Sequence, residues 1–285
     1  ASWCQYIDDE RISVVFTVPF TLIEMMQRGA MGQRDLSSLR WILFGGEPFP
    51  PKHLRTLMAQ LPAVRFTNVY GPAEAPSCTC YDLPQDAKLG DEPIPIGTVS
   101  VNSEDLIVNA DDEECAIGEA GELCIRSSTL TKGYWNRPEL NEKVYLFRKS
   151  HGPFPDVFFR TGDMVARHAD GLLRFLGRKD RMVKTRGNRV ELDEVEAAFA
   201  SHAAVAEAAA YVIPDNAGSK SIMAAVKLSK DADATIAALT QHAKTILPSY
   251  ALPQELFIVN EFPRTTSGKI DRRELAEKTE HLGKT

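Results

Sequence analysis

Three short apolar runs alternate with two helix-like stretches in the first seventy residues, and this alternation constrains the fold more than any other feature. The apolar runs, expected to be strands, are residues 12–18, 39–44 and 65–69. The stretches between them, expected to be helices, are residues 21–28 and 51–61. Strands and helices that alternate at this spacing predict a parallel sheet. Because such sheets bind ligands beyond the carboxyl ends of their strands, we expect a site around residues 45–47 and 71–74.

The pattern of apolar and turn residues changes twice after this α/β segment. Residues 94–175 contain short alternating strands divided by Gly, Asp and Pro, which predict a small antiparallel sheet or barrel. Residues 141–155 are expected to be an irregular connection. The strands expected within this region are residues 106–109, 121–126 and 171–176.

The last hundred residues predict a separate α+β domain of about the usual minimum size. Its expected elements are a hairpin at 182–190, helices at 191–201 and 232–247, and strands at 205–213, 222–228 and 255–259. Pro248 is expected to stop the second helix. We place the boundary at Asp180, so that residues 1–179 belong to one domain and residues 180–285 to the next.

Charge and cysteine content exclude several classes of protein. A net charge of −6 argues against a nucleic-acid partner, and no apolar run approaches the roughly 20 residues of a membrane helix. The five cysteines form no C-x-x-C pair and no zinc spacing, which favours reduced thiols and a cytoplasmic location. The chain contains no Gly-x-Ser-x-Gly, His-Glu-x-x-His or Gly-x-Gly-x-x-Gly motif, so serine hydrolase, zinc protease and Rossmann dehydrogenase functions have no support.

Several polar residues follow glycines or expected strand ends, and each has two interpretations. Glu74 suits a Mg²⁺ ligand near phosphates, or a helix-start acid. Asp163 suits a ribose-diol acceptor, or an Asx-turn, and Arg178 is a charged partner or a surface residue. Lys269 follows Gly268 in a polar loop, so its ammonium can reach phosphate or carboxylate oxygens, or it is a solvated turn lysine.

The order of these signals is more specific than any one of them. The series is 68–74 (NVYGPAE), 121–123 (GEL), 133–135 (GYW), 159–163 (FRTGD), 177–192 (GRKDRMVKTRGNRVEL), 247–250 (LPSY) and 267–272 (SGKIDR). It resembles the later core motifs of the adenylate-forming enzymes, and above all the amino-acid adenylation domains of nonribosomal peptide synthesis and free-standing, prolyl-type carrier-protein ligases. The resemblance spans essentially the whole chain. It implies an α/β fold, in which the C-terminal part of a large adenylation subdomain precedes a small mobile α+β subdomain.

The resemblance implies a two-step ligase that uses ATP and Mg²⁺. A carboxylate, expected to be an amino acid, attacks the α-phosphate of ATP, and pyrophosphate leaves. The phosphopantetheine thiol of a carrier protein then takes the acyl group. In the first step, catalysis is positioning and charge neutralisation.

The residue roles that the resemblance implies fall into four groups. Lys269 and Glu74 are catalytic, and Glu74 is the metal ligand. The nucleotide site comprises Gly45, Gly46, Glu47, Asn68, Tyr70, Gly71, Asp163, Arg178 and Lys269. Tyr70 is expected to stack on adenine, Asn68 to bind its amino group, and Asp163 to accept the ribose diol with Arg178 in support. Asp180 is the expected hinge, and Lys184 and Gly187 lie on the loop that faces the pantetheine after the small domain turns.

The acid pocket is predicted to be small and mostly apolar, which favours proline or another small amino acid. Its candidate residues are Thr17, Leu43, Gly45, Val69, Ser77 and Cys78. Two departures from the family pattern stand out. Ala73 replaces the usual Thr, which removes one hydroxyl from the phosphate site. The phosphate loop and the segment that binds the amino group are not in this sequence, so we expect a fragment or a chain that needs a partner for roughly 200 residues.

Two other functions remain open at this point. An acyl- or aryl-CoA ligase would transfer the acyl group to free CoA, whereas Pro72 favours the peptide-synthetase side. A noncatalytic module that only holds a carrier protein or partner subunit would have no need of Glu74, Asp163, Arg178 and Lys269 together. Binding of ATP distinguishes that module from either enzyme.

Overall fold

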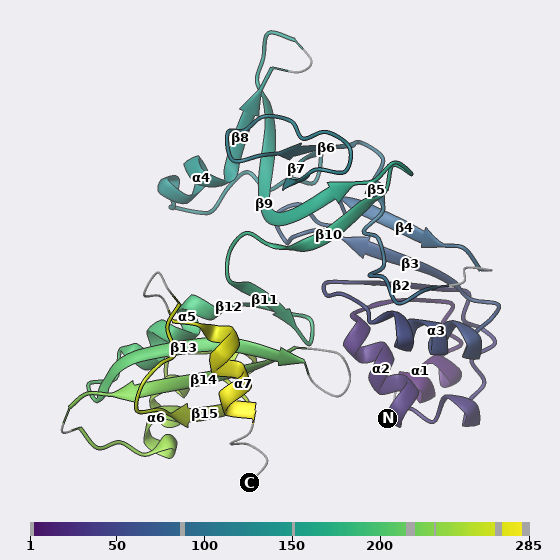
Figure 1. The fold of residues 1–285 in the computed structure, drawn as a ribbon. Helices are drawn as coiled ribbons and strands as arrows, with labels where there is room; N and C mark the ends of the chain where they lie inside the picture. The colour runs from purple at the N-terminus through teal and green to yellow at the C-terminus, as the bar shows by residue number, and fades with distance from the viewer. Residues whose placement is uncertain are drawn as a thin grey trace. The chain divides into compact units, whose positions relative to one another are not determined.

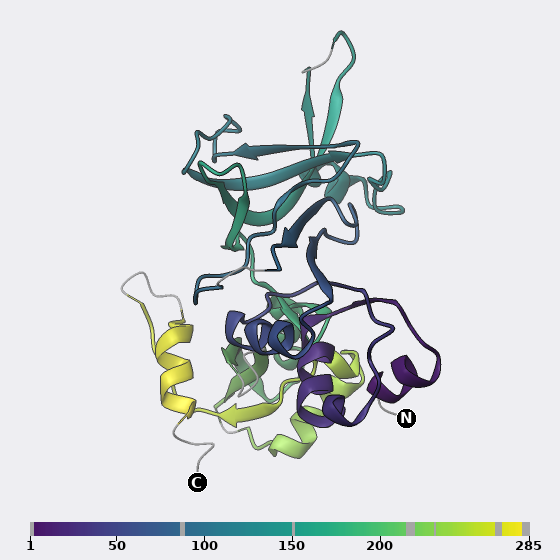
Figure 2. The same cartoon turned by 90° about the vertical axis from the view of Figure 1, so that its right-hand side faces the viewer.

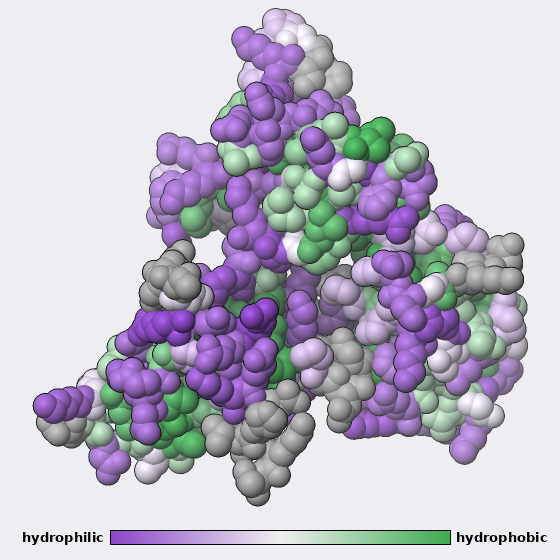
Figure 3. All heavy atoms as spheres, viewed as in Figure 1, coloured by the Kyte–Doolittle hydropathy of each residue, from purple (hydrophilic) through white to green (hydrophobic). Residues whose placement is uncertain are grey.

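The computed structural model describes residues 3–85, 89–149, 152–214, 220–230, 232–265 and 270–280. The chain divides into two compact units, Ala1–Asp180 and Arg181–Thr285, one residue away from the expected boundary. In the space-filling view, hydrophilic side chains cover much of the visible face of each unit, with smaller hydrophobic groups between them (Figure 3). No helix among the described residues is long and apolar enough to cross a membrane.

The first sheet of the large unit has five strands in the order β1-β2-β3-β4-β5. The strands are β1 (Val14–Thr17), β2 (Trp41–Gly45), β3 (Arg65–Tyr70), β4 (Thr79–Leu83) and β5 (Thr98–Val99). The first three are parallel, as expected, whereas β4 and β5 add antiparallel pairs and make the sheet mixed. Only eight residues (71–78) connect β3 to β4, too few for the crossover that a parallel strand needs.

Helices cover one face of this sheet. They are α1 (Trp3–Asp9), α2 (Pro19–Arg28) and α3 (Pro51–Gln60), which lie below β2 and β3 in Figure 1. Alternate strand residues point into this layer, where Ile42, Phe44 and Phe66 are at most 2% exposed. Proline at the first position of α2 and α3 starts each helix just after a strand or turn, which leaves the strand ends at one edge.

The second sheet is antiparallel and occupies the region expected for the small barrel. Its strands are β6 (Ser103–Val108), β7 (Ala120–Ser127), β8 (Tyr145–Arg148), β9 (Asp156–Arg167) and β10 (Leu173–Arg178). β9 is the long central strand: β7 pairs along one edge, while β8 and β10 share the other, and the β8 end projects as a ribbon (Figure 2). Leu123, Ile125 and Val165 form the centre of its apolar core.

The prediction of an irregular connection over 141–155 is wrong in its first half. A short helix, α4 (Pro138–Val144), and the strand β8 occupy that stretch. Pro138 starts the helix, and pairing with β9 buries Leu146 of β8. This order comes from a strand distant in sequence, so local composition did not reveal it.

The small unit is a three-stranded sheet between helices, preceded by a hairpin. The hairpin is β11 (Met182–Thr185) with β12 (Asn188–Glu191), and the sheet has the order β13 (Val205–Pro214), β14 (Lys220–Leu228), β15 (Glu255–Ile258). The helices α5 (Leu192–Ala200) and α6 (Ile236–Lys244) pack on one face, and α7 (Arg272–Glu280) packs on the other (Figure 1). The helix expected from residue 232 begins only at Ile236, because the Thr235 hydroxyl accepts a hydrogen bond from the Ala238 amide and caps it.

Candidate active site

The residues predicted to line the acid pocket lie toward one edge of the first sheet, except for Leu43, which is the middle residue of β2. They are Thr17, Leu43, Gly45, Val69, Ser77 and Cys78. Thr17 ends β1 and Gly45 ends β2, and Gly45 lies opposite Val69 in the register. Ser77 and Cys78 directly precede β4, whose first residue pairs with Tyr70 at the end of β3. The pairing of β1 to β4 therefore brings together positions that are up to 61 residues apart.

The turn after β2 joins this edge to the helix layer. A Cβ atom on Gly45 would lie 2.0 Å from the carbonyl oxygen of Val69, so this close approach requires glycine. Gly46 follows with a φ of +90°. The Glu47 carboxylate then accepts a hydrogen bond from the Phe20 amide (3.0 Å) at the start of α2. This contact satisfies a helix N-terminus and fixes the turn.

Tyr70, Asp163, Arg178 and Asp180 form one hydrogen-bonded network. Asp163 is 1% exposed, and its two oxygens accept from the Tyr70 hydroxyl and from the Arg178 guanidinium (2.7 Å). Arg178 also donates to the Thr161 carbonyl (2.6 Å) and to Asp180 (Nε to Oδ1, 2.8 Å). The structure thus joins the end of β3, the middle of β9 and the end of the large unit through charged hydrogen bonds.

The electrostatics of this network fix its protonation. Burial, and then the charge of Asp163, raises the pKa of the Tyr70 hydroxyl well above its ordinary value, so the phenol stays a donor. Burial alone would lower the pKa of Arg178, but its hydrogen bonds to Asp180 and the charge of Asp163 raise it. A neutral phenol and a permanent cation therefore hold the Asp163 carboxylate from two sides.

Asn68, Gly71 and Glu74 surround the end of β3. The Asn68 amide nitrogen donates to the Pro95 carbonyl at 2.8 Å. Gly71 starts the turn after β3, and Glu74, 8% exposed, follows in the same turn. A Glu74 oxygen accepts from the Tyr134 hydroxyl at 2.5 Å, and the Glu74 carbonyl accepts from the Thr131 amide at 2.8 Å. Tyr134 lies in the GYW motif, which sequence reasoning noted without giving this residue a role.

Glu122 is a second residue that sequence reasoning missed. It is 6% exposed, and one of its oxygens accepts from the Gly162 amide (3.2 Å) in the turn before Asp163. The other accepts from Lys179 (3.1 Å) and Arg160 (3.3 Å). The only signal in the sequence was its position in the GEL motif, between residues that are buried in β7.

The predicted thiolation loop is the turn of the β11–β12 hairpin. Thr185 pairs with Asn188, which leaves Arg186 and Gly187 as a two-residue turn with φ values of +48° and +80°. Two positive φ values define a type I′ turn, for which glycine is favoured. Lys184 pairs with Arg189 one step before the turn.

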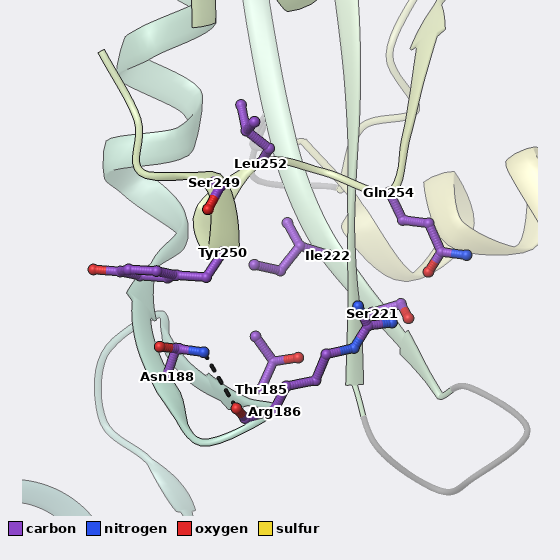
Figure 4. A pocket seen from close by; sticks show the side chains of 9 residues that line it. All are labelled: Thr185, Arg186, Asn188, Ser221, Ile222, Ser249, Tyr250, Leu252 and Gln254. Carbon is purple, nitrogen blue, oxygen red and sulfur yellow. Dashed lines mark hydrogen bonds between the residues drawn. The ribbon is translucent and has the colours of Figure 1, made fainter. Parts of the chain in front are cut away.

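This hairpin borders a cavity of about 440 Å³ in the small unit (Figure 4). The cavity is lined by Thr185, Arg186, Asn188, Ser221, Ile222, Ser249, Tyr250, Leu252 and Gln254. Its apolar side is formed by Ile222, Leu252 and the Tyr250 ring. The Ser221 hydroxyl is buried at the rim of β14 and has no hydrogen-bond partner within the described residues. The cavity thus suits a ligand with both methylene and amide groups.

Lys269 lies in residues 266–269, outside the described residues. The chain on both sides of this segment is well defined. Arg264 and Ile270 form an antiparallel bridge, and the Asp271 amide donates to the Pro263 carbonyl at 2.8 Å. Asp271 also accepts from the Arg273 and Glu274 amides (both 3.1 Å) and thereby caps α7. The residues on the two sides of the segment are therefore paired with each other at the start of α7.

The side chains present limit metal and thiol chemistry. No group of three or more His, Cys, Asp or Glu side chains gathers in the described part of the chain. A Mg²⁺ ion that is shared with substrate phosphates needs only one or two protein carboxylates, and Glu74 fits that requirement. Burial, and then the charge of Glu122, raises the pKa of Cys124 to about 12, so this thiol is not a nucleophile.

The large unit combines an edge of parallel strands with the buried Asp163 carboxylate, which binds Tyr70 at the end of β3, and a small α+β unit follows it in the chain. Such strand edges commonly bind ligands. Comparison with known families agrees. The profile of the AMP-binding enzyme family matches residues 1–135, and that of the AMP-binding enzyme C-terminal domain matches residues 194–269. The chain belongs to this family of adenylate-forming, AMP-forming ligases, as the sequence motifs predicted.

Individual relatives support the same assignment. An L-proline--[L-prolyl-carrier protein] ligase of Pseudomonas fluorescens is 36% identical over 96% of this chain and 52% of its own length. Tyrocidine synthase 3 of Brevibacillus parabrevis is 36% identical over 84% of this chain and 4% of its own length.

Solved structures share the fold. The amide bond synthetase McbA from Marinactinospora thermotolerans matches 95% of this chain and 53% of its own, with a TM-score of 0.84 and 27% identity. A nonribosomal peptide synthetase protein with adenylation and PCP domains, bound to a vinylsulfonamide inhibitor, matches 96% of this chain and 46% of its own, with a TM-score of 0.83 and 27% identity. The chain thus spans about half the length of the prolyl-carrier ligase and of these structures.

Proposed function

We propose that this chain takes part in ATP-dependent activation of an amino acid as its acyl-adenylate, followed by transfer to the phosphopantetheine thiol of a carrier protein. The observation that carries the proposal is the Tyr70–Asp163–Arg178–Asp180 network. It couples a buried carboxylate suited to a ribose diol with the last residue of the large unit. The family assignment and the named carrier-protein relative add support.

The adenylation step divides among a few residues in this proposal. Asp163 accepts the ribose hydroxyls: the oxygen that binds Arg178 has a further lone pair, and the other oxygen takes a ribose hydroxyl in place of Tyr70. Asn68 donates through its amide nitrogen to Pro95, so its carbonyl oxygen is oriented to accept from the adenine amino group. Glu74 holds Mg²⁺, which when bound neutralises phosphate charge. Lys269 approaches the substrate carboxylate and the α-phosphate, and stabilises the charge that develops there.

If the nucleotide is to contact both the Tyr70 ring and Asp163, the Tyr70 hydroxyl must give up its hydrogen bond to Asp163. The Tyr70 side chain is 6% exposed, and its hydroxyl is bound to Asp163. We propose that nucleotide binding replaces this hydroxyl with a ribose hydroxyl and frees the ring to stack on adenine. Gly45, Gly46, Glu47 and Gly71 form the adjoining turns, and the Glu47 contact to α2 holds the turn after β2 in place.

The second step uses the small unit. We propose that Asp180 is the hinge, so that Lys269 serves adenylation and then leaves, after which the hairpin with Lys184 and Gly187 faces the thiol. The cavity beside this hairpin supports the proposal, because a pantetheine arm combines amides with short methylene segments (Figure 4). The five free cysteines fit a cytoplasmic setting.

Activity is expected only when the rest of the adenylation domain is present, because the chain spans half of its relatives' length. The experiments below therefore use the complete enzyme, meaning this chain together with the polypeptide that corresponds to the other half.

Substrate identity is tested by ATP–pyrophosphate exchange across acids. The pocket positions Thr17, Gly45 and Val69 are small or apolar, so proline or another small apolar amino acid is expected to give the strongest exchange. Large and charged amino acids, benzoates and fatty acids serve as the comparison set. Exchange that occurs only with aryl or fatty acids would contradict an amino-acid substrate.

An acyl-CoA ligase is the second candidate. It is favoured by a structural match to an o-succinylbenzoate CoA synthetase of Bacillus subtilis, with a TM-score of 0.78 and 25% identity. Thioester formation on free CoA, in the absence of a carrier protein, would select this candidate. A protein that binds no ATP in calorimetry would instead be a noncatalytic module.

The Ala73→Thr variant tests the phosphate site. Ala73 is exposed in the turn after β3, so a threonine hydroxyl there is expected to donate to an ATP phosphate. A typical net hydrogen bond contributes about 0.5–1.5 kcal/mol, so we expect the KM for ATP to fall about 2- to 10-fold. Ala73→Val, which has the same shape without the hydroxyl, is the control. An unchanged KM in the threonine variant would show that no phosphate lies near this position.

A further inference from the structure

One carboxylate in the small unit binds two arginines from opposite ends of its sequence. Glu196, on α5, accepts from Arg181 through both oxygens (2.7 and 2.8 Å) and from Arg272 (2.9 Å to the nearer oxygen). Arg181 is the first residue of the unit, directly after the proposed hinge. Arg272 is the first residue of α7, three positions after Lys269.

The Glu196 carboxylate is fixed in its own right. Its side chain is 17% exposed, and one oxygen also accepts from the Ala210 amide of β13 at 2.7 Å. Arg181 also donates to the Ala210 carbonyl at 2.8 Å, so Glu196, Arg181 and Ala210 each contact the other two. Burial alone would raise the pKa of Glu196, but hydrogen bonds from Arg181, Ala210 and Arg272 lower it. The carboxylate is therefore a charged, multiply bonded centre on a rigid face.

The residues that flank 266–269 are anchored close to this centre. They are joined by the Arg264–Ile270 bridge and by the hydrogen bond between Asp271 and Pro263. Ile270 packs with the buried Phe262 and Leu275. Ile270 and Asp271 lead directly into α7, so Arg272 is held within two residues of the Arg264–Ile270 bridge.

We propose that Glu196 is a positioning residue that sets the loop of Lys269 relative to the hinge. Binding Arg181 and Arg272 to a single carboxylate makes the entry to the small unit and the base of the lysine loop one rigid body. When the small unit rotates about Asp180, Lys269 is then expected to move with the unit as part of one rigid body. This role rests on the function proposed above, because it matters only if Lys269 acts in adenylation.

The test is Glu196→Gln in the complete enzyme, assayed for both half-reactions. Glutamine keeps the shape and an acceptor for Ala210, but it loses the charge that holds two arginines. Small misplacements of a catalytic group can cost up to about 100-fold, so we expect pyrophosphate exchange to fall between about 10-fold and 100-fold in kcat, with little change in the KM for ATP. Thioester formation from supplied acyl-adenylate, which does not use Lys269, is expected to stay near the wild-type rate.

Asp193→Asn is the matched control. Asp193 pairs with Arg181 as well, but it is 71% exposed, and Arg272 pairs with Glu196, so both half-reactions are expected to remain. If Glu196→Gln unfolds the protein, Arg272→Lys keeps the charge and is expected to give a smaller loss in the same half-reaction. Equal losses of rate in both half-reactions, or no loss of pyrophosphate exchange, would overturn the proposal.

A second measurement separates this proposal from the proposed function. Hydrogen exchange of the backbone amides at 262–272 is expected to speed up in Glu196→Gln and to stay unchanged in Asp193→Asn. If hydrogen exchange at 262–272 were unchanged in Glu196→Gln, the positioning role would be overturned, whatever the activity of the variant. If the amides at 262–272 exchange hydrogen slowly in the wild-type enzyme, but the enzyme catalyses pyrophosphate exchange with no acid, only the proposed function would be overturned.

Discussion

Replacing Lys269 with alanine is expected to abolish most adenylation and to leave the thioester step. A donor that is aimed at charge developing in the transition state contributes about 10²–10³-fold in kcat, and we expect a loss of that size in pyrophosphate exchange. The KM for ATP is expected to change little, because the lysine acts on the transition state more than on bound ATP. Thioester formation from supplied acyl-adenylate measures the second step separately.

Lys278→Ala is the matched control for this variant. Lys278 lies on α7, the helix that follows the same loop, and its 62% exposed side chain pairs with Glu274 one turn earlier. Exposed pairs of this kind contribute little, so neither half-reaction is expected to change. If Lys269→Ala slowed both half-reactions equally, its role would be structural, and if it slowed neither, the adenylation lysine would lie elsewhere.

The parts of the fold that follow local rules were predictable from the sequence. Short apolar runs that alternate with helix-like stretches predicted the three parallel strands of the first sheet. The division near Asp180 was also visible, because the texture of the sequence changes there. In contrast, β4 and β8 are ordered by strands far away in sequence, and no local pattern distinguished them from loops.

The same distinction applies to the site. Asp163 and Arg178 were recognisable because each follows a glycine in a motif, and the structure joins them directly. Glu122 and Glu196 were not, since their importance comes from charged partners 15 to 76 residues away. A carboxylate inside a strand or helix looks like any solvated acid until the fold brings arginines to it. Sequence motifs therefore located the residues expected to touch substrate, but not the residues that hold them.

The Asp163→Asn variant is expected to have the largest combined effect on binding and stability. Asparagine keeps the shape but removes the charge that Arg178 and Tyr70 bind. Hydrogen bonds to charged groups contribute about 1.5–3 kcal/mol, so the loss of charged acceptance by the ribose diol is expected to weaken ATP binding about 10- to 100-fold. Calorimetry with ATP on the complete enzyme measures this change, and the affinity for the amino acid is expected to remain.

Stability should fall in the same variant, because a buried cation loses its buried partner. The Arg178 side chain is 10% exposed and Asp163 is 1% exposed, whereas Asp180, the other acid on Arg178, is 47% exposed. Removing one member of a buried pair costs about 3–5 kcal/mol, and the remaining contact with Asp180 places the expected loss near the lower end, about 3 kcal/mol in the free energy of unfolding. Asp170→Asn, which breaks the exposed pair with Arg174, is the control and is expected to cost less than about 0.5 kcal/mol in urea unfolding. A variant that loses stability but keeps its ATP affinity would show that Asp163 serves only the fold, and the nucleotide site would then have to be sought away from this network.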